Sequence, residues 1–259
     1  MKSNETMIEV NHLSHLYVDE NGNDVRALDD VSLTIRRGEF VAIIGTNGSG
    51  KSTLAKVITR IVKPDGGSIL FKGEDFTKLN SAKLREYRKN VQMVFQNPNS
   101  TFSPRMNIGD FLCEGMLNFK LANKKEALKK AKEYLELVKL PTDIMERLPH
   151  QLSGGQLQRV VIARALTLSP EVLIYDEATA ALDVSVQQDV LKLMYDLRKS
   201  CDNSVIFICH DLAAVRLVAD RIIVMYKGKI VEIVESRNLL SESKEEYTKK
   251  LLGSVFEVK

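Results

Sequence analysis

The sequence predicts an α/β fold, and three observations support this prediction. Short apolar runs typical of buried strands alternate with longer segments in which apolar residues recur at helical spacing. Several of these runs end on polar residues, as strands do at the ligand-binding edge of an open α/β sheet. A glycine-rich segment, residues 45–53, lies directly between one apolar run and one helical pattern.

The glycine-rich segment predicts a site for a nucleoside triphosphate. The pattern Gly45–x–x–x–x–Gly50–Lys51–Ser52 matches a phosphate-binding loop, in the strand–loop–helix context that such a loop requires. Glycines let the backbone point several amide groups at one place, and the positive end of the following helix favours an anion. Lys51 adds a cation for the outer phosphates, and the Ser52 hydroxyl is suited to Mg²⁺.

Length and composition fit a globular protein of one or two domains. The chain has 259 residues, of which 44% are hydrophobic and 27% charged. A net charge of +3 is too balanced to predict a nucleic-acid partner. No apolar run approaches the ~20 residues that cross a bilayer, and the N-terminus lacks the apolar core of a signal peptide. We therefore expect a cytosolic chain that can dock on a membrane protein. Cys113, Cys201 and Cys209 show no metal-ligand spacing and are expected to pack.

Hydrophobic periodicity and turn residues predict the remaining elements. Strands are expected at residues 8–10, 31–35, 68–71, 91–95, 172–176, 205–209, 221–226 and 229–234. Helices are expected at residues 81–89, 108–117, 124–138, 153–166, 187–199 and 243–252. The helical stretch from about residue 97 to residue 164 interrupts the alternation of strands and helices, and we interpret it as an inserted subdomain.

Two side chains near predicted strands are candidates for contacts with the nucleotide and its metal. Tyr17 precedes a turn at Asn21–Gly22, and its flat ring suits a purine base, although a surface tyrosine of a strand explains the position equally well. Gln96 follows the strand at residues 91–95, where an amide can ligate a metal or orient water. A solvated loop glutamine is the alternative.

Two further strand ends carry groups suited to hydrolysis. Asp176 closes the strand at residues 172–176, where it can hold Mg²⁺ directly or through water, and Glu177 can polarise an attacking water. The alternative is an acidic strand end in solvent, which the four preceding apolar residues disfavour. His210 follows the strand at residues 205–209 and can contact a γ-phosphate or the water, although a histidine at a strand end more often packs or caps.

A second glycine-rich helix start lies at residues 152–156. Ser153 is a plausible N-cap for the helix that follows. Gly154 and Gly155 expose backbone amides toward an anion, which makes this a second candidate anion site beside the phosphate loop. The segment 181–183 then leads into the helix at residues 187–199.

Together, and in this order, these motifs resemble the ATP-binding subunits of ABC transporters, from residue 8 to about residue 252. Leu152–Ser153–Gly154–Gly155–Gln156 is similar to a signature that is specific to that superfamily. The resemblance implies an α/β P-loop NTPase fold of the ABC type, with an antiparallel β subdomain and an inserted α-helical subdomain. It divides the chain into one ATPase domain at residues 7–252, with a core at 7–96 and 165–235, a helical subdomain at about 97–164, and a C-terminal helix and tail at 236–259.

The resemblance also implies roles for the matched residues. Tyr17 stacks on adenine, Glu177 is the general base, and His210 senses the γ-phosphate. Mg²⁺ is surrounded by Ser52, Gln96 and Asp176. The phosphates of ATP are bound by Gly45, Thr46, Asn47, Gly48, Ser49, Gly50, Lys51, Ser52 and Thr53. The ATP of a partner subunit is capped by Ser153, Gly154, Gly155 and Gln156, with Asp183 near the same seam.

The implied activity is ATP hydrolysis at a head-to-tail dimer interface, formed with a second copy or with a sister ATPase. The implied partners are two transmembrane permease subunits and an extracytoplasmic solute-binding protein, which places the chain on the cytoplasmic face of the membrane. Residues 95–106, 183–187 and 247–252 are similar to the oligopeptide, dipeptide and nickel importer ATPases. Because the permease and binding protein choose the cargo, peptide, nickel and a related small solute remain open.

The chain departs from the family pattern at two positions. Ala180 stands where serine is usual before Ala–Leu–Asp, and Leu157 stands where a charged or polar residue is commoner. The longer C-terminal extension of many peptide-importer subunits is expected to be missing.

Two other functional classes use the same phosphate loop. One is a soluble ABC ATPase of DNA repair, translation or iron–sulfur assembly, but the chain lacks the coiled coil, zinc cysteines or second cassette of the repair and translation members. The other is a small-molecule kinase, which the second glycine-rich helix start disfavours.

Overall fold

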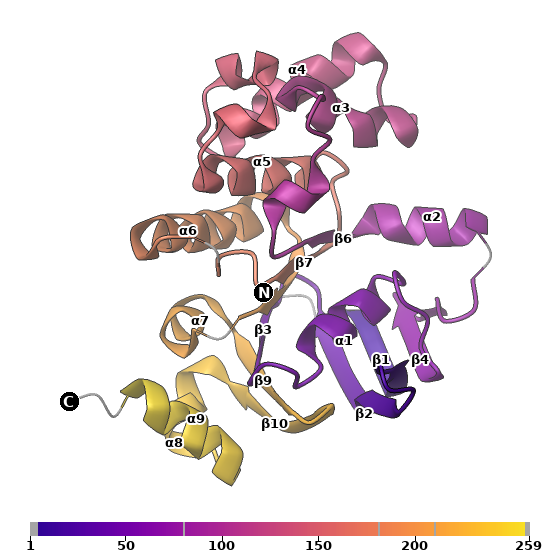
Figure 1. Cartoon of the computed structure of the whole chain (residues 1–259), viewed down its shortest axis with the longest axis vertical. Helices are drawn as coiled ribbons and strands as arrows, with labels where there is room; N and C mark the ends of the chain where they lie inside the picture. The colour runs from indigo at the N-terminus through magenta and orange to yellow at the C-terminus, as the bar shows by residue number, and fades with distance from the viewer. Residues whose placement is uncertain (1–4, 80, 181, 210, 257–259) are drawn as a thin grey trace. The chain divides into compact units, whose positions relative to one another are not determined.

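The computed structural model describes all residues except 1–4, 80, 181, 210 and 257–259 (Figure 1). The chain forms two compact units. The first unit comprises Met1–Arg88 and Asn203–Lys259, and the second comprises Lys89–Asp202. Among the described residues, no helix combines the length and the apolar character needed to cross a bilayer.

The first unit contains an antiparallel sheet with the strand order β2-β1-β4-β5. Its strands are β1 (Thr6–Val18), β2 (Asp24–Arg36), β4 (Gly66–Phe71) and β5 (Glu74–Asp75). Alternate residues of β2 are buried, such as Val31, Leu33 and Ile35, so one face of the sheet packs on the core. This is the antiparallel β subdomain that the sequence predicts.

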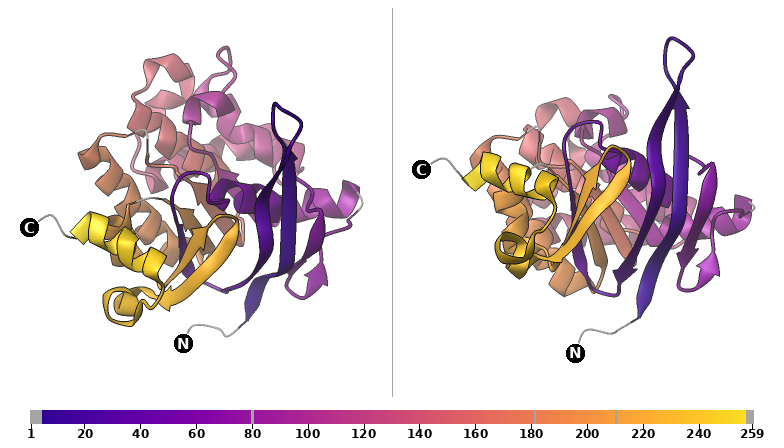
Figure 2. Two further views of the ribbon diagram at one scale, coloured as in Figure 1. Left: turned by 60° about the horizontal axis from the view of Figure 1, so that its bottom comes forward. Right: turned by 90° about the horizontal axis from the view of Figure 1, so that it is seen from below.

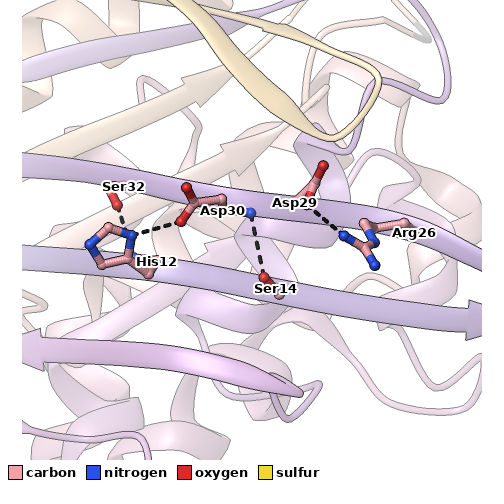
Figure 3. Close-up of polar contacts among 6 residues, drawn as sticks. All are labelled: His12, Ser14, Arg26, Asp29, Asp30 and Ser32. Atoms are coloured by element: carbon pink, nitrogen blue, oxygen red, sulfur yellow. Dashed lines mark hydrogen bonds and ion pairs between the residues drawn. The ribbon is translucent and has the colours of Figure 1, made fainter.

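β1 and β2 are each 13 residues long, much longer than the predicted strands at 8–10 and 31–35. Their register shifts between Val10 and Leu13, and His12 and Asp30 have positive φ angles of 51° and 57°. In Figure 3 these two residues face each other across the strands, with His12 Nδ1 2.7 Å from Asp30 Oδ1. Such bulges interrupt the period-two pattern by which strands are recognised, so the sequence shows only part of each strand.

The turn between β1 and β2 is formed by the predicted Asn21–Gly22 pair. The Asp19 carboxylate accepts hydrogen bonds from the backbone amides of Asn21 (2.9 Å) and Asn23 (2.7 Å), and Gly22 has a φ of 81°. The bonds from Asn23 lower the pKa of Asp19 below its ordinary value. Figure 2 shows this hairpin extending beyond the rest of its sheet.

The other strands of the first unit follow the order β10-β9-β3-β8. They are β3 (Phe40–Ile44), β8 (Ser204–Ile208), β9 (Arg221–Tyr226) and β10 (Lys229–Glu235). β3 runs parallel to both β8 and β9, whereas β9 and β10 form an antiparallel hairpin. Every residue of β3 and β8 is buried, which explains their uninterrupted apolar sequences.

The helices of the first unit begin with α1 (Lys51–Ile58), which follows β3 and the glycine-rich loop. The others are α2 (Ser81–Asn90), whose last two residues belong to the second unit, α7 (Leu212–Val218), α8 (Leu239–Glu242) and α9 (Glu246–Phe256), with a 3₁₀ turn at Ser236–Asn238. The tail was expected to form one helix at residues 243–252, but it forms two. The backbone is extended at Ser243, and Glu232 Oε1 accepts a 2.6 Å hydrogen bond from Lys244 N, which ties the break to β10.

The C-terminal end of α1 is fixed by polar groups from the first unit. The Tyr87 hydroxyl donates to the carbonyl of Ile58 at 2.5 Å, and Arg88 donates to the carbonyl of Arg60 at 2.6 Å. Tyr87 is fully buried against Phe71 and Phe76, and burial raises the pKa of its hydroxyl. α1 is therefore held firmly at the end opposite the glycine-rich loop.

Over its described residues, the second unit combines a parallel pair of strands with a group of α-helices. The strands are β6 (Val91–Val94) and β7 (Val172–Asp176). The helices are α3 (Ile108–Asn118), α4 (Lys124–Leu137), α5 (Gly154–Leu166) and α6 (Val184–Cys201). Shorter 3₁₀ turns cover Pro98–Thr101, Thr142–Glu146 and Pro149–Gln151.

The helical stretch predicted at residues 97–164 lies within this second unit. α3 begins at an Asn107 cap, and α4 begins with a capping box formed by Asn123 and Glu126. Arg164 joins α5 to α3, because its guanidinium lies 2.6 Å from Glu114 Oε2 and 4.5 Å from the centre of the Phe111 ring. α4 contacts both α3 and α5, so these three helices pack on one another.

Candidate nucleotide site

The glycines of the predicted phosphate loop are required by the backbone. Gly45 and Gly50 have φ angles of 153° and 102°. A Cβ at Gly45 would lie 2.2 Å from the carbonyl oxygen of Met225, and one at Gly50 would lie 2.4 Å from that of Ala27. Gly48 has a φ of 75° but faces open space. The loop therefore keeps its shape only with glycine at both of its ends.

The helix after the loop presents an open N-terminus. Gly50 is the N-cap of α1 in a left-handed conformation, no side chain caps it, and no acidic residue lies in the first turn. The first-turn amides of a helix lack acceptors inside the helix, and their dipoles make this end positive. Ser52 and Thr53 lie half-buried in this turn. The arrangement suits a polyanion.

Lys51 supplies a buried positive charge at the loop. Its side chain is only 4% exposed, and its ammonium donates to the carbonyls of Gly45 (2.9 Å) and Thr46 (3.0 Å). A buried ammonium needs such partners to offset its lost hydration. The charge is therefore fixed beside the loop amides, where a phosphate oxygen can become a further partner.

The ring of Tyr17 packs against His15 and is partly exposed to solvent. Its ring is 39% exposed and meets the ring of His15 edge to face, with 4.6 Å between centroids. His15 Nδ1 lies 2.9 Å from Asp65 Oδ2, and Leu16 N donates to the same oxygen at 2.7 Å. Val25, paired with Tyr17 on β2, is also exposed. An exposed ring on a fixed support can stack on a flat base.

His15 and Asp65 were not predicted as part of the site. Asp65 directly precedes β4, about 50 residues from Tyr17 in the sequence, and no local spacing links the two. His15 lies beyond the strand expected at residues 8–10, so the sequence offered no indication of this contact.

The predicted acidic pair lies at the end of β7 in the second unit. Asp176 is 6% exposed, whereas Glu177 is partly exposed and has a positive φ of 50°. The Glu177 carbonyl accepts a hydrogen bond from Ala180 N at 3.0 Å, which closes a tight turn. A non-glycine residue in this conformation is uncommon and often marks a functional site. A buried carboxylate such as Asp176 is suited to a cation.

The structure brings Gln96 to the same edge as this acidic pair. β6 ends at Val94, one residue earlier than expected, and Val94 pairs with Tyr175 in the parallel register with β7. Gln96 and Glu177 therefore each lie two residues beyond a matched pair, and Gln96 is exposed. Tyr175 itself is buried, and burial raises the pKa of its hydroxyl.

The second glycine-rich segment begins α5 as predicted. Ser153 is the N-cap: its Oγ accepts from Gln156 N at 3.4 Å, and Gln156 Oε1 accepts from Ser153 N at 3.0 Å. This reciprocal pair is a capping box. Ser153 and Gly154 are exposed, so the start of α5 lies on the surface of the second unit.

α5 and α6 pack against each other at this start (Figure 1). A Cβ at Gly155 would lie 2.5 Å from Val186 Cγ1, whereas one at Gly154 would make ordinary contact with Leu182 at 3.7 Å. Asp183, the N-cap residue of α6, is exposed close to this contact and makes no capping bond with its side chain. The structure thus brings Asp183 to the same surface as residues 153–156.

Leu157 and the cysteines have packing roles. Leu157, where the family commonly has a polar residue, is only 4% exposed and faces the interior. Cys113 and Cys209 are buried and Cys201 is half-buried, and burial raises the thiol pKa of Cys113 and Cys201. Ala180 is exposed, and nothing in the structure explains its replacement of serine.

One catalytic candidate and the metal site remain to be considered. His210, the predicted γ-phosphate sensor, lies outside the described residues. Within the described ranges, no group of three or more histidine, cysteine, aspartate or glutamate side chains is arranged to hold a metal ion. A mixed set of hydroxyl, amide and carboxylate oxygens is what Mg²⁺ uses when phosphates supply its other ligands.

The phosphate loop, the carboxylate-ended strand and the second helix start define the class of this protein as a P-loop ATPase. Residues 28–180 match the ABC transporter family, and the chain belongs to that family. This confirms the predicted fold class and the predicted ATP-hydrolysing activity of a transporter subunit.

Two relatives and one solved structure show the extent of the similarity. The chain is 42% identical to the oligopeptide transport ATP-binding protein OppF of Bacillus subtilis over 253 residues, covering 97% of this chain and 83% of OppF. It is 42% identical to a putative peptide import ATP-binding protein of Brucella ovis over 231 residues, covering 89% and 73%. The dimeric ATP-binding cassette MJ0796, in a post-hydrolysis state with ADP and Pi, matches with a TM-score of 0.80 at 30% identity, covering 89% and 99%.

Proposed function

We propose that this chain is the ATP-hydrolysing subunit of a peptide importer. It works on the cytoplasmic face of the membrane, paired with a second ATPase subunit and bound to two permease subunits that receive cargo from an extracytoplasmic solute-binding protein. One observation carries the cargo class: the 42% identity to an oligopeptide transport subunit extends over 97% of the chain. Import of nickel or another small solute is the alternative.

In this proposal the first unit binds ATP through residues 45–53. Three features support the fit: the forced glycine conformations, the open N-terminus of α1 and the buried ammonium of Lys51. Tyr17 stacks on adenine, which its exposed and supported ring favours. The loop thus binds the phosphates, and the hairpin of β1 and β2 binds the base.

The proposed ligands of Mg²⁺ are Ser52, Gln96 and Asp176, as the family resemblance implies. All three offer oxygen atoms, and the buried Asp176 carboxylate is the anionic member. When bound, Mg²⁺ neutralises charge on the phosphates. One carboxylate with neutral oxygen ligands is the kind of site that this ion accepts.

Glu177 is the proposed general base. It accepts a proton from the water whose oxygen bonds to the γ-phosphorus, while the bond from that phosphorus to the β–γ bridging oxygen breaks to give ADP and phosphate. The partial exposure of Glu177 and its place after a buried carboxylate support this role. His210 is proposed to contact the γ-phosphate, on the basis of family resemblance.

Residues 153–156 and Asp183 are proposed to act on the ATP of the partner ATPase. The amides of Gly154 and Gly155 lie in the first turn of α5, where a helix provides them with no acceptor. A γ-phosphate bound by one subunit can be that acceptor, so that ATP joins two subunits and hydrolysis lets them separate. This cycle would move the permeases between inward-facing and outward-facing states.

Reconstitution with the co-purifying permeases and binding protein tests the proposal. In liposomes that contain ATP on the side of this subunit, we expect uptake of labelled oligopeptide, and no uptake when Glu177→Gln replaces the wild-type chain. Uptake of radioactive nickel but not peptide would support the alternative cargo. ATP hydrolysis by a chain that associates with no permease would contradict the proposal.

A further inference from the structure

The phosphate loop is held from outside by the turn between β9 and β10. Gly228 in this turn donates from its amide to the carbonyl of Ser49 at 3.0 Å, and its own carbonyl accepts from Asp29 N at 2.9 Å. The Asp29 carboxylate lies 2.9 Å from Arg26 (Figure 3) and 3.1 Å from Lys229. The C-terminal part of the loop, at Ser49, is therefore connected to β2 through this turn.

The N-terminal limb of the loop is held by Tyr247, which lies in α9 and is 201 residues away in the sequence. The Tyr247 hydroxyl oxygen accepts a hydrogen bond from Thr46 N at 2.9 Å and donates one to Thr46 Oγ1 at 3.0 Å. Its ring packs on Tyr226 with centroids 4.2 Å apart and planes 33° apart. Thr248, the next residue, is fully buried and anchors this part of α9. Tyr247 is thus rigidly placed.

A rigid phenol at this position has a clear physical effect. The loop binds phosphate only when its backbone amides converge. If the loop is flexible before binding, ordering it costs conformational entropy, and this cost lowers the affinity for the nucleotide. Tyr247 uses both the donor and the acceptor capacity of its hydroxyl on a single residue of the loop. The Thr46 amide is thereby directed to α9, which orients the first peptide group after Gly45.

We propose that Tyr247 is a positioning residue for nucleotide binding, so that docking of α9 sets the affinity of the phosphate loop for ATP. This inference rests on the proposed ATP site of the first unit. It also gives a role to the tail residues 247–252, which are similar to the oligopeptide, dipeptide and nickel importer ATPases. A purely structural role for Tyr247 would stabilise the unit without changing nucleotide affinity selectively.

The variant Tyr247→Phe tests the proposal, because it removes the hydroxyl and keeps the ring that packs on Tyr226. Tyr134→Phe is the matched control: the Tyr134 hydroxyl lies 3.3 Å from Ser169 Oγ, within the second unit. Two measurements apply to the full chain. Amide hydrogen exchange of the peptide that contains Thr46 is followed without nucleotide, and ATP and ADP affinities are measured by titration.

For Tyr247→Phe we expect faster exchange at Thr46 and Kd values for ATP and ADP that rise about threefold to tenfold. The KM for ATP should rise more than kcat falls. Tyr134→Phe should leave all of these unchanged. A second variant, Tyr226→Leu, removes the packing partner but keeps the hydroxyl, and should shift exchange and affinity in the same direction by a smaller factor.

Unchanged exchange and unchanged Kd in Tyr247→Phe would overturn the inference. An equal rise in Kd for Tyr134→Phe would also overturn it, because that result would indicate general destabilisation. Failure of the wild-type chain to bind ATP would contradict the proposed function instead, and exchange at Thr46 would still report whether Tyr247 restrains the loop.

Discussion

The two glycine-rich helix starts of this chain are built in different ways. At α1 the glycines adopt positive φ angles, the N-cap Gly50 has no side-chain capping bond, and a buried lysine lies in the first turn. At α5 a capping box of Ser153 and Gln156 closes the start, and Gly155 serves close packing on Val186. The start of α1 is thus suited to binding an anion directly, whereas the start of α5 is closed by its own capping bonds and lies on the surface.

The two constructions suit the two glycine motifs to the separate tasks proposed for them. The α1 loop supplies a buried cation, and the first turn of α1 supplies backbone amides for which a helix offers no acceptor of its own, so this start can bind a polyphosphate by itself. In the capping box the amides of Ser153 and Gln156 already have acceptors, so the α5 start can add only a limited number of donors to an anion held elsewhere. We therefore propose that phosphate binding and completion of a partner's site belong to different helix starts.

Replacing Glu177 should change ATP hydrolysis more than any other substitution considered below, without involving the two glycine-rich helix starts. Glu177→Gln should lower kcat for ATP hydrolysis by about 10²–10⁴-fold and leave ATP affinity unchanged, because it removes the proposed general base and keeps a side chain of the same size. Single-turnover hydrolysis and ATP titration in the presence of the partner subunits measure both quantities. The matched control is Glu136→Gln on the surface of α4. Wild-type turnover by Glu177→Gln would end the general-base assignment.

Alanine substitutions in the α1 loop should affect stability and ATP binding to different extents at Gly50 and Gly48. Gly50→Ala places a Cβ 2.4 Å from a backbone carbonyl at a φ of 102°, so the loop must shift. We expect a loss of about 2–4 kcal/mol in the free energy of unfolding and ATP binding weakened by at least about tenfold. Gly48→Ala meets only the conformational cost of about 1–2 kcal/mol, because its side faces open space. Equal losses in both variants, measured by denaturation and titration, would contradict the steric account.

A smaller effect is expected at the α5 start. Gly155→Ala should lower the free energy of unfolding by about 1–3 kcal/mol through the clash with Val186, and should reduce ATP hydrolysis by the assembled ATPase while the isolated chain binds ATP normally. The double variant Gly155→Ala, Val186→Ala should recover part of the stability. Gly154→Ala, with an ordinary contact at 3.7 Å, is the control and should be neutral or stabilising. Weakened ATP binding in the isolated Gly155→Ala chain would contradict the proposal that the α5 start acts only on the ATP of a partner subunit.

The smallest effect concerns the base. Tyr17→Ala should raise the Kd for ATP about twofold to tenfold, and Tyr17→Phe should not, because stacking needs the ring and not the hydroxyl. Neither variant should change the affinity for inorganic tripolyphosphate, which contacts only the phosphate loop. A parallel loss of tripolyphosphate affinity in Tyr17→Ala would show that Tyr17 acts on the loop and not on the base.

The parts of the fold that follow from local pattern were predictable, whereas those that depend on distant contacts were not. The spacing of Gly45 and Gly50 fixes the phosphate loop, and Ser153 with Gln156 predicts the capped start of α5. The extended strands β1 and β2 were recognised only in part, because bulges near His12 and Asp30 break the alternation.

The missed features of the site share one physical cause. His15 with Asp65 and Tyr247 with Thr46 join residues about 50 and 201 positions apart, so no spacing rule connects them. The break between α8 and α9 depends on Glu232, which accepts from the backbone of Lys244. These contacts are set by tertiary packing, and sequence periodicity records only which face of each element is apolar.

The central claim is that the α5 start of one subunit completes the ATP site of another. Sedimentation velocity of Glu177→Gln with ATP, alone and mixed with the co-purifying ATPase subunit, tests this claim most directly. We predict an ATP-dependent species of two cassettes that is lost when Ser153→Arg is added, although ATP still binds. A Glu177→Gln chain that binds ATP and sediments as a single cassette under both conditions, or a two-cassette species that Ser153→Arg does not affect, would contradict the claim.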